Sequence, residues 1–306
     1  MTSNSSARYL NNIDITSISK IHKTENKNSA KPSSMAEFLE SFSRKSTRRM
    51  YERGARGWRI SNTRRLRTVI RSLFYALITT RTSVKFATAK LRRETNKCNR
   101  IRDCVDLAFN VFNVFPFRLL SIRPAQVEEE ITELLRVSAK HEPKFLLEIG
   151  TAKGGTLFLL ARVSSPDAMI ISIDLPSGRF GGGYPEWRKT LYELFATCRQ
   201  NIHLIREDSH SLATLHMVKK ALKGRKLDLL FIDGDHTYKG VKRDFEMYNK
   251  LVSKGGIIAF HDVCPHLPQT GCEVDKFWCE IKDEYEHVEI VRDWKQGWAG
   301  IGVLYV

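Results

Sequence analysis

The stretch Phe145-Leu-Leu-Glu-Ile-Gly-Thr-Ala-Lys-Gly-Gly155 decides the fold of this 306-residue chain. Its first five residues predict a short buried strand, and the glycines after it predict a turn into a helix that begins near Gly154. In open α/β sheets a ligand lies outside the carboxyl end of such a strand. Glycines there let a ligand approach the backbone, because no Cβ intervenes. A tight turn without a ligand is the alternative interpretation.

The spacing of this turn indicates which ligand to expect. It reads Glu148-x-Gly150-x3-Gly154, which differs from the G-x-G-x-x-G fingerprint of dinucleotide-binding proteins. An acidic residue two positions before the first glycine supplies a carboxylate to a ligand with a cationic head. We therefore predict that Glu148, Gly150, Thr151 and Gly154 bind a cofactor of that kind.

Further apolar runs predict the rest of the sheet. Runs at 169–173, 202–205, 227–232 and 256–260 each end in polar residues and alternate with helical patterns. Nearly continuous apolar strands of this kind are typical of a parallel sheet that helices cover on both faces. Two last strands, near 288–291 and 300–306, are too close for a crossover helix and should pair antiparallel. The predicted fold is α/β: a Rossmann-like seven-stranded sheet, with five parallel strands and a C-terminal antiparallel hairpin.

Charge divides the chain into two parts. Residues 1–123 contain 26 Lys and Arg against 8 Asp and Glu, a net charge of +18, whereas residues 124–306 contain 24 against 26, a net charge of −2. Residues 1–35 are polar and poor in aromatic residues, which predicts a disordered tail. We expect a basic helical region at 36–120, whose apolar end at 104–120 docks on the core, and a globular α/β domain at 121–306.

The basic region has three possible roles. Leu66, Ile70, Leu73 and Leu77 recur at helical spacing beside several arginines, which indicates a basic amphipathic helix. This helix could pack on the domain or on a partner chain, as in a homo-oligomer. Residues 40–103 could instead bind an anionic membrane surface. The third role, a nucleic-acid contact, lacks an aromatic-interleaved motif to support it.

The composition indicates in which cellular compartment we expect the protein. No run reaches the roughly 18 apolar residues of a membrane span, and the N-terminus lacks the apolar core of a secretory signal. The six cysteines form no C-x-x-C pair, which favours reduced thiols. We expect a cytoplasmic protein, peripheral at the inner face of the membrane if the basic helix binds lipid.

Acidic residues follow the second and third predicted strands. Asp174 is placed to accept hydrogen bonds from both hydroxyls of a ribose. Asp208 and Ser209 are similarly placed for an adenine ring, although an N-cap for the helix that begins near Leu212 explains them equally well. These three residues complete the predicted cofactor site.

The fourth and fifth strands end in a group of acids and imidazoles. Asp233 and His236 follow the fourth strand, and His261 and Asp262 follow the fifth. Because these ends open at one edge of the sheet, their charges need a cation or protons to coexist. We predict a metal site of Asp233, Asp262 and His261; carboxylate oxygens favour Mg²⁺, and the imidazole would also tolerate Mn²⁺. Asp235 is explained better as a helix cap.

Zinc is the alternative metal. His261, Cys264, His266 and Cys272 offer suitable donors, but their spacing matches no common zinc motif. A zinc ion held by these residues would also block the pocket.

Three motifs together resemble the class I S-adenosylmethionine-dependent methyltransferases. Residues 148–155, 231–238 and 256–263 are similar to the bacterial family that includes macrolide-sugar O-methyltransferases and cephalosporin-hydroxylase-like proteins. The stretches 180–184 and 297–302 agree with it. The resemblance covers about residues 120–306 and implies S-adenosylmethionine as cofactor.

The resemblance also implies roles for individual residues. Asp233 takes the position of a magnesium ligand, and His236 takes that of the proposed general base. A pair of acids completes the metal site in that family, and here the pair is His261-Asp262, so the chain departs at one ligand. His261 is the second candidate for the base.

We therefore expect an O-methyltransferase, assisted by a divalent metal, that acts on a hydroxyl of a sugar or another small molecule. The alternatives are a hydroxylase-like relative with the same fold, and a protein that binds a nucleoside or glycan without catalysis. The presence of His236 beside Asp233 argues against a simple binder, because binding needs no base.

Overall fold

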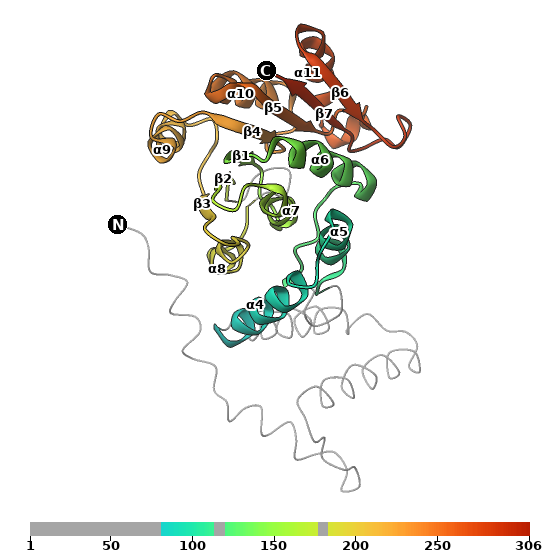
Figure 1. Ribbon diagram of the computed structural model, residues 1–306. Helices are drawn as coiled ribbons and strands as arrows, with labels where there is room; N and C mark the ends of the chain where they lie inside the picture. The colour runs from blue at the N-terminus through green and yellow to red at the C-terminus, as the bar shows by residue number, and fades with distance from the viewer. Residues whose placement is uncertain (1–80, 113–119, 177–182) are drawn as a thin grey trace, which may run out of the picture. The chain divides into compact units, whose positions relative to one another are not determined.

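The computed structural model describes residues 81–112, 120–176 and 183–306 (Figure 1). The predicted tail at 1–35 and the amphipathic stripe from Leu66 to Leu77 lie outside the described residues. No helix among the described residues is long and apolar enough to cross a membrane.

A seven-stranded sheet forms the centre of the described part, in the order β3-β2-β1-β4-β5-β7-β6. The first five strands are mutually parallel, and β7 pairs antiparallel with both β5 and β6. The predicted fold class is thereby confirmed. The strands are β1 (Phe145–Ile149), β2 (Met169–Ile173), β3 (Asn201–Ile205), β4 (Leu227–Ile232), β5 (Val252–His261), β6 (Glu286–Ile290) and β7 (Ile301–Tyr305).

The chain reverses its direction of travel across the sheet after β3. From β1 it moves outward through β2 to β3, then returns to place β4 on the other side of β1. The helices after β1 and β4 therefore leave toward opposite faces of the sheet. Ligands of open α/β sheets bind at such a switch point.

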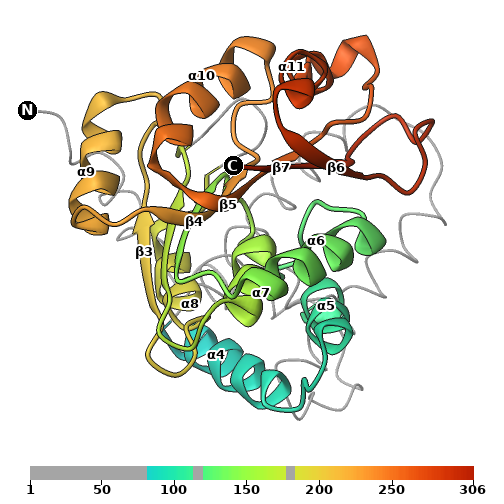
Figure 2. The ribbon, with the colours of Figure 1, turned by 45° about the horizontal axis from the view of Figure 1, so that its top comes forward.

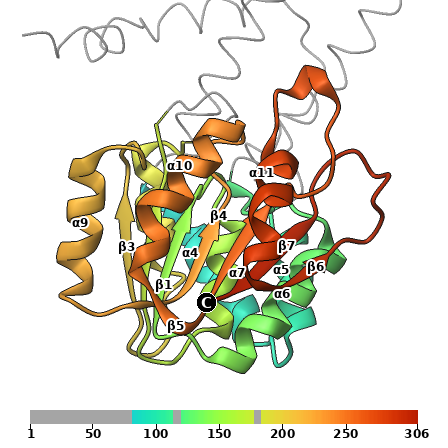
Figure 3. The same cartoon turned by 90° about the horizontal axis from the view of Figure 1, so that it is seen from above.

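Helices cover both faces of the sheet (Figures 2 and 3). One face carries α4 to α8, and the other carries α9, α10 and α11, which lie side by side in the view from above. The helices are α4 (Arg81–Thr95), α5 (Ile101–Asn110), α6 (Glu128–His141), α7 (Gly155–Val163), α8 (Lys189–Glu193), α9 (Leu212–Leu222), α10 (Tyr238–Tyr248) and α11 (Val274–Ile281).

The helices of the basic region pack on the same core as the sheet. Ala87 of α4 and Val105, Ala108 and Phe109 of α5 are buried with residues of α6, α7 and β1. The expectation that the apolar stretch from residue 104 docks on the core is met for residues 104–112, which the structure describes. Burial of apolar side chains stabilises this attachment by roughly 25 cal/mol for each Å² removed from water.

Local signals fix where the helices on the site side begin. Ser211 caps α9 by accepting a hydrogen bond from the amide of Ala213 at 3.2 Å. Thr237 caps α10 by accepting from the amide of Gly240 at 3.0 Å. These caps satisfy amides that would otherwise lack partners in the first turn. They also hold the loops after β3 and β4, which carry the site residues, at the carboxyl edge of the sheet.

Candidate active site

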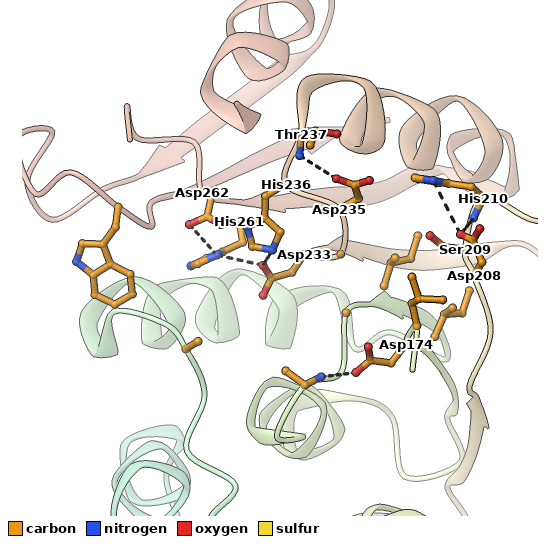
Figure 4. Close-up of a pocket in the computed structure, with 18 residues that line it drawn as sticks. Asp174, Asp208, Ser209, His210, Asp233, Asp235, His236, Thr237, His261 and Asp262 are labelled. Carbon is orange, nitrogen blue, oxygen red and sulfur yellow. Dashed lines mark hydrogen bonds and ion pairs between the residues drawn. The ribbon is translucent and has the colours of Figure 1, made fainter. Parts of the chain in front are cut away.

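A cavity of about 510 Å³ opens at the carboxyl edge of the sheet. It extends from the end of β3, past β2, β1 and β4, to the end of β5, with Trp298 of the β6–β7 connection at its border. Eight predicted site residues line it: Gly150, Asp174, Asp208, Ser209, Asp233, His236, His261 and Asp262. Figure 4 shows Asp208, Ser209 and His210 at one end and the acids and imidazoles of β4 and β5 toward the other.

The glycines of the first turn are required by the protein itself. Gly150 has φ +99, and a Cβ there would collide with the backbone carbonyl of Asp233. Gly154 has φ +80 as the N-cap of α7, and its Cβ would meet the ring of Tyr192 at 2.6 Å. Only glycine adopts such conformations at little cost. The close approach of β1 and β4 therefore explains Gly150 even before any ligand is considered.

Asp174 is held by backbone amides on both sides. Its Oδ2 accepts from the amide of Ala152 at 2.6 Å, and its Oδ1 accepts from the amide of Gly183 at 2.7 Å. Burial nevertheless raises the pKa of the carboxyl, because the charged form loses water. The fixed amides orient the carboxylate at the cavity wall, where its remaining lone pairs are available to a donor such as a hydroxyl.

Two predicted cofactor residues lie behind the cavity wall. Glu148 is fully buried and accepts a hydrogen bond from Ser172 Oγ at 2.5 Å, and Thr151 Oγ1 lies 2.5 Å from the same hydroxyl. Burial, with the charges of Asp233 and Asp174 nearby, raises the pKa of Glu148 to about 8. Glu148, Thr151 and Gly154 are not among the residues that line the cavity. Sequence spacing predicted their neighbourhood but not the direction of their side chains.

The end of β3 brings a histidine to the cavity that the sequence analysis did not select. Asp208 Oδ1 accepts from the amide of His210 at 2.9 Å, so Asp208 shapes the loop while Ser211 caps α9. His210 Nε2 lies 3.3 Å from the buried carboxylate of Asp244, and this pairing raises the pKa of His210. Its position directly after Asp208-Ser209 was the available signal.

Asp233, His261 and Asp262 form one cluster. One ligand atom from each lies within 4.8 Å of the others. His261 Nδ1 is 3.2 Å from Asp233 Oδ1 and 3.2 Å from Asp262 Oδ1, while Gln126 Nε2 donates to Asp233 Oδ2 at 2.9 Å. Parallel pairing of β4 with β5 places these strand ends together. The predicted metal-site residues therefore meet, and Gln126, which no sequence signal identified, supports them.

His261 is buried without a well-formed hydrogen bond. Its side chain is only 4% exposed; Nδ1 is held by the two ion pairs alone, and Nε2 has no hydrogen-bond partner. Burial disfavours its charged form, but Asp262 and Asp233 outweigh this and raise the pKa of His261 well above the ordinary value. Buried polar atoms without hydrogen bonds are rare, and this imidazole lies beside two carboxylates, where a cation could bind.

Asp262 occupies a strained backbone conformation. Its φ is +66, which aspartate tolerates better than most residues but still at a cost. Its Oδ1 accepts from the amide of Ala299 at 3.1 Å, and His266 Nε2 is 3.1 Å from the same oxygen. Burial would raise the pKa of Asp262, but His261, His236 and His266 hold it well below the ordinary value. The carboxylate is thus ionised and surrounded by imidazoles.

His236 lies between the two carboxylates. Its Nδ1 is 2.5 Å from Asp262 Oδ2, and its Nε2 is 3.6 Å from Asp233 Oδ1. Burial lowers its pKa, but hydrogen bonds with Asp262 and Cys272 and the charge of Asp233 raise it to about 10. Asp262 therefore fixes the ring orientation and leaves Nε2 on the side of Asp233.

The structure groups the candidate zinc ligands differently from the set considered in the sequence analysis. Cys272 instead comes together with His236 and Asp262, since one ligand atom from each lies within 4.8 Å of the others, and His266 Nε2 is 3.1 Å from Asp262 Oδ1. Burial raises the pKa of this thiol, but the two imidazoles lower it overall. Cys264 instead lies 3.7 Å from Gln296 Nε2, so it is directed at a different part of the loop. Asp235 accepts from the amide of Thr237 at 3.0 Å, as expected of a residue that shapes a helix start.

The β6–β7 connection is tied to the site by a buried acid. Glu130 of α6 accepts hydrogen bonds from the amides of Arg292 and Gly300 and from Gln296 Nε2, at 3.0, 2.9 and 2.8 Å. This loop carries Trp298, which is 42% exposed and lines the cavity. The Gly-Trp-Ala-Gly stretch was a sequence signal for this loop. Nothing in the sequence indicated that Glu130 would hold the loop through these hydrogen bonds.

A comparison with protein families matches residues 147–263 to a family described as a methyltransferase domain. This span runs from β1 to just beyond β5 and contains every acid and imidazole of the cavity described above. For this part of the chain the predicted resemblance to a methyltransferase domain is confirmed. The narrower resemblance, to the sugar O-methyltransferases and cephalosporin-hydroxylase-like proteins, stays a prediction.

Among curated proteins, an uncharacterized protein of Acanthamoeba polyphaga mimivirus is 33% identical over 138 residues. The match covers 44% of this chain and 60% of that protein. Among solved structures, the O-methyltransferase TomG from Streptomyces achromogenes is 18% identical with a TM-score of 0.46, covering 68% of this chain and 90% of its own. A TDP-rhamnose 3'-O-methyltransferase of calicheamicin biosynthesis is 17% identical with a TM-score of 0.43, covering 67% and 92%.

Proposed function

We propose that this chain is an S-adenosylmethionine-dependent O-methyltransferase in which a divalent cation assists transfer to a hydroxyl of a sugar or another small molecule. One observation carries the proposal. A single cavity joins a carboxylate held by backbone amides, Asp174, to the carboxylate–imidazole group of Asp233, His236, His261 and Asp262.

The β2 and β3 side of the cavity suits the nucleoside of the cofactor. Asp174 presents an oriented carboxylate to which two neighbouring ribose hydroxyls can donate. Asp208, Ser209 and His210 line the same cavity after β3, the strand next to β2, where the base would follow the ribose. S-adenosylmethionine supplies an electrophilic methyl group on its sulfonium when it is bound.

The β4 and β5 side suits a divalent cation. Asp233, His261 and Asp262 offer two carboxylates and one imidazole within 4.8 Å of one another. His261 Nδ1 already faces both carboxylates at 3.2 Å without forming a hydrogen bond, an arrangement that a shared cation would complete. Carboxylates favour Mg²⁺, and the imidazole makes Mn²⁺ an equally suitable ion.

His236 is the proposed general base. Asp262 Oδ2 lies 2.5 Å from Nδ1, and Nε2, 3.6 Å from Asp233 Oδ1, is the nitrogen that we assign to take the proton of the acceptor hydroxyl. With its pKa raised to about 10 by the surrounding carboxylates, His236 is protonated near neutral pH. A bound divalent cation would supply positive charge that acidifies the hydroxyl and lowers this pKa. The base and the cation are therefore expected to act together.

Trp298 is the proposed platform for the acceptor. It borders the cavity next to the carboxylate–imidazole group, and the loop that carries it is fixed by Glu130 and by Asp262. An indole presents a flat apolar face that suits the apolar face of a sugar or an aromatic ring. A small ring-containing acceptor with a free hydroxyl fits this arrangement.

The test is turnover by the full chain with methyl-labelled S-adenosylmethionine. The acceptor panel contains sugars, phenols and polyketides, each assayed with Mg²⁺ and with EDTA. Transfer of label to an acceptor, abolished by EDTA and restored by Mg²⁺ or Mn²⁺, is the expected result. Cofactor binding without transfer to any acceptor would favour a nucleoside-binding protein, and labelled product unaffected by EDTA would contradict the cation.

A further inference from the structure

A thiol and two imidazoles gather around the carboxylate of Asp262. One ligand atom each from His236, Asp262 and Cys272 lies within 4.8 Å of the others. His236 Nδ1 is 2.5 Å from Asp262 Oδ2, and His266 Nε2 is 3.1 Å from Asp262 Oδ1. Burial raises the pKa of the Cys272 thiol, but His236 and His266 lower it overall. Four potential donors from three different segments therefore converge.

Backbone contacts hold these segments in place. The amide of Glu273, next to Cys272, donates to the carbonyl of His236 at 2.8 Å. His266 Nδ1 lies 2.8 Å from the carbonyl of Cys264, which leaves Nε2 directed at Asp262. The side chains of Asp262 and His266 are 6% and 7% exposed, and that of His236 is 21% exposed. The donors are therefore fixed and partly shielded from water, as a coordinating group must be.

We propose that His236, Asp262, His266 and Cys272 form a binding site for a thiophilic divalent cation, typified by Zn²⁺, and that its occupation inhibits methyl transfer. One thiolate, two imidazoles and one carboxylate are a donor set of the kind that holds four-coordinate zinc. A thiolate favours Zn²⁺ over Mg²⁺, because soft sulfur ligands suit borderline-soft ions. The cation replaces the protons that these four side chains share, and the displaced protons pass to solvent.

This site differs in chemistry from the group of Asp233, His261 and Asp262. That group contains more carboxylate and lacks sulfur, so it suits Mg²⁺ or Mn²⁺. Asp262 belongs to both groups and His236 only to the thiol-containing one. The two sites therefore compete for a shared carboxylate, and each selects its ion through the residues that it does not share.

The inhibitory consequence rests on the proposed function. A zinc ion on Nδ1 of His236 converts the proposed base into a ligand and adds positive charge beside its other nitrogen. Both effects oppose proton transfer from an acceptor hydroxyl to Nε2. Loss of Asp262 from the cluster of Asp233 and His261 would weaken the activating cation as well. Zinc is thus expected to act as an inhibitor that Mg²⁺ relieves only at high concentration.

The metal site can be tested without any methyl transfer. Co²⁺ is added to the full chain as a spectroscopic substitute for Zn²⁺, and a thiolate-to-cobalt absorption band in the near ultraviolet is expected at one equivalent. Cys272→Ser should remove this band and weaken Zn²⁺ binding, measured by competition with a chromophoric chelator, by at least about 10²-fold. Cys198→Ser, which changes an exposed thiol, is the matched control and should keep both.

Inhibition is tested separately, as the ratio of each variant's own rates with and without stoichiometric Zn²⁺. The parent and Cys198→Ser should be inhibited, and Cys272→Ser should lose most of the inhibition. A cobalt band or zinc affinity that Cys272→Ser leaves unchanged would overturn the site. A site confirmed by the band but without effect on turnover would overturn only its inhibitory role. If no acceptor supports turnover, the proposed function fails while the cobalt band still decides the site.

Discussion

The carboxylates at the two ends of the cavity are stabilised by different kinds of partner. The carboxylate of Asp174 accepts hydrogen bonds from two backbone amides, which cannot change their protonation state. Asp262, in contrast, is surrounded by three imidazoles, all of which can lose or gain a proton. Fixed dipoles suit a group that only binds, because they cost no reorganisation. Titratable partners suit a group that must exchange a proton or accept a cation during a reaction.

The backbone is strained at both ends of the cavity, but at different residues. Near Asp174 the positive φ angles belong to Gly150, at +99, and to Ala152, at +45, whose amide donates to the carboxylate. At the other end Asp262 itself has φ +66, and the contacts of Ala299 and His266 hold it there. Strain that the surrounding structure must maintain is characteristic of functional positions. We infer that proton and cation chemistry belongs to the β4–β5 end of the cavity, and the predictions below test that division.

The largest effect is expected from His236→Ala. Removal of the proposed base should lower turnover by about 10²–10⁴-fold while S-adenosylmethionine affinity stays nearly unchanged. It should also remove the acidic limb of the pH–rate profile, because the base works only after it has lost its proton. Calorimetry and steady-state rates over a pH series measure both properties.

His216→Ala, on helix α9 outside the residues that line the cavity, is a matched control for loss of an imidazole. His261→Ala provides a sharper comparison. If His261 is a metal ligand, its loss should alter the preference between Mg²⁺ and Mn²⁺. If His261 is the base, its loss should reproduce the pH profile of His236→Ala. If His236→Ala keeps the rate and the pH profile of the parent, His236 is not the general base.

The next effect concerns the metal. Asp233→Asn keeps the size of the side chain but removes its charge, so Mg²⁺ affinity and turnover should each fall by about 10²-fold. Cofactor affinity should change little, because Asp233 lies at the opposite end from Asp174. Metal titration and calorimetry on the same variant check the two statements. Equal losses of metal and cofactor affinity would contradict the proposal that the metal and the cofactor bind at different ends of the cavity.

Asp174→Ala should weaken the cofactor and spare the metal. Hydrogen bonds from hydroxyls to a charged acceptor contribute about 1.5–3 kcal/mol each, and the released amides of Ala152 and Gly183 would add to the cost. Asp174→Asn is the conservative companion, since it keeps one acceptor oxygen. Calorimetry that shows unchanged affinity in Asp174→Ala, or tight binding of NAD by the parent, would contradict the cofactor assignment.

Glu148 predicts a dependence of stability on pH. Its pKa is near 4.5 in the unfolded chain and about 8 when folded, so the native state holds a proton that the unfolded state releases. Its contribution is therefore fully present below about pH 4.5 and is lost as pH rises through about 8. Glu148→Gln should raise the free energy of unfolding near pH 8.5 by on the order of 2 kcal/mol relative to the parent.

Near pH 5 the same variant should differ little from the parent, because Glu148 is then protonated in the folded state. Denaturant unfolding at the two pH values makes the comparison. A difference between variant and parent that does not change with pH would show that Glu148 is ionised in the native protein.

The smallest effect is expected at the border of the cavity. Trp298→Ala should raise KM for a ring-containing acceptor by the equivalent of about 0.5–1.5 kcal/mol and leave cofactor affinity unchanged. Trp294→Ala, in the same loop and exposed to a similar extent, is the control. An equal change in both variants would indicate a loop effect rather than a platform for the acceptor.

The strands and the residues that follow them were determined by the sequence. Strands β1, β2 and β4 have the predicted limits, because strands buried on both faces need uninterrupted apolar runs that polar residues then end. Asp174, Asp233 and His261 come directly after such runs, and Asp262 and His236 follow within four positions. Since parallel strands share one carboxyl edge, their order along the chain was enough to place them around one cavity.

Only the tertiary structure decided how these residues are connected to one another. Glu130 clamps a loop more than 150 positions away, Gln126 reaches Asp233 across 107 positions, and Cys272 meets His236 from the segment before α11. Such contacts depend on how helices pack on a finished sheet and where irregular loops cross its edge. Periodicity and spacing describe one segment at a time, so they contain no record of which distant side chain will complete a hydrogen bond.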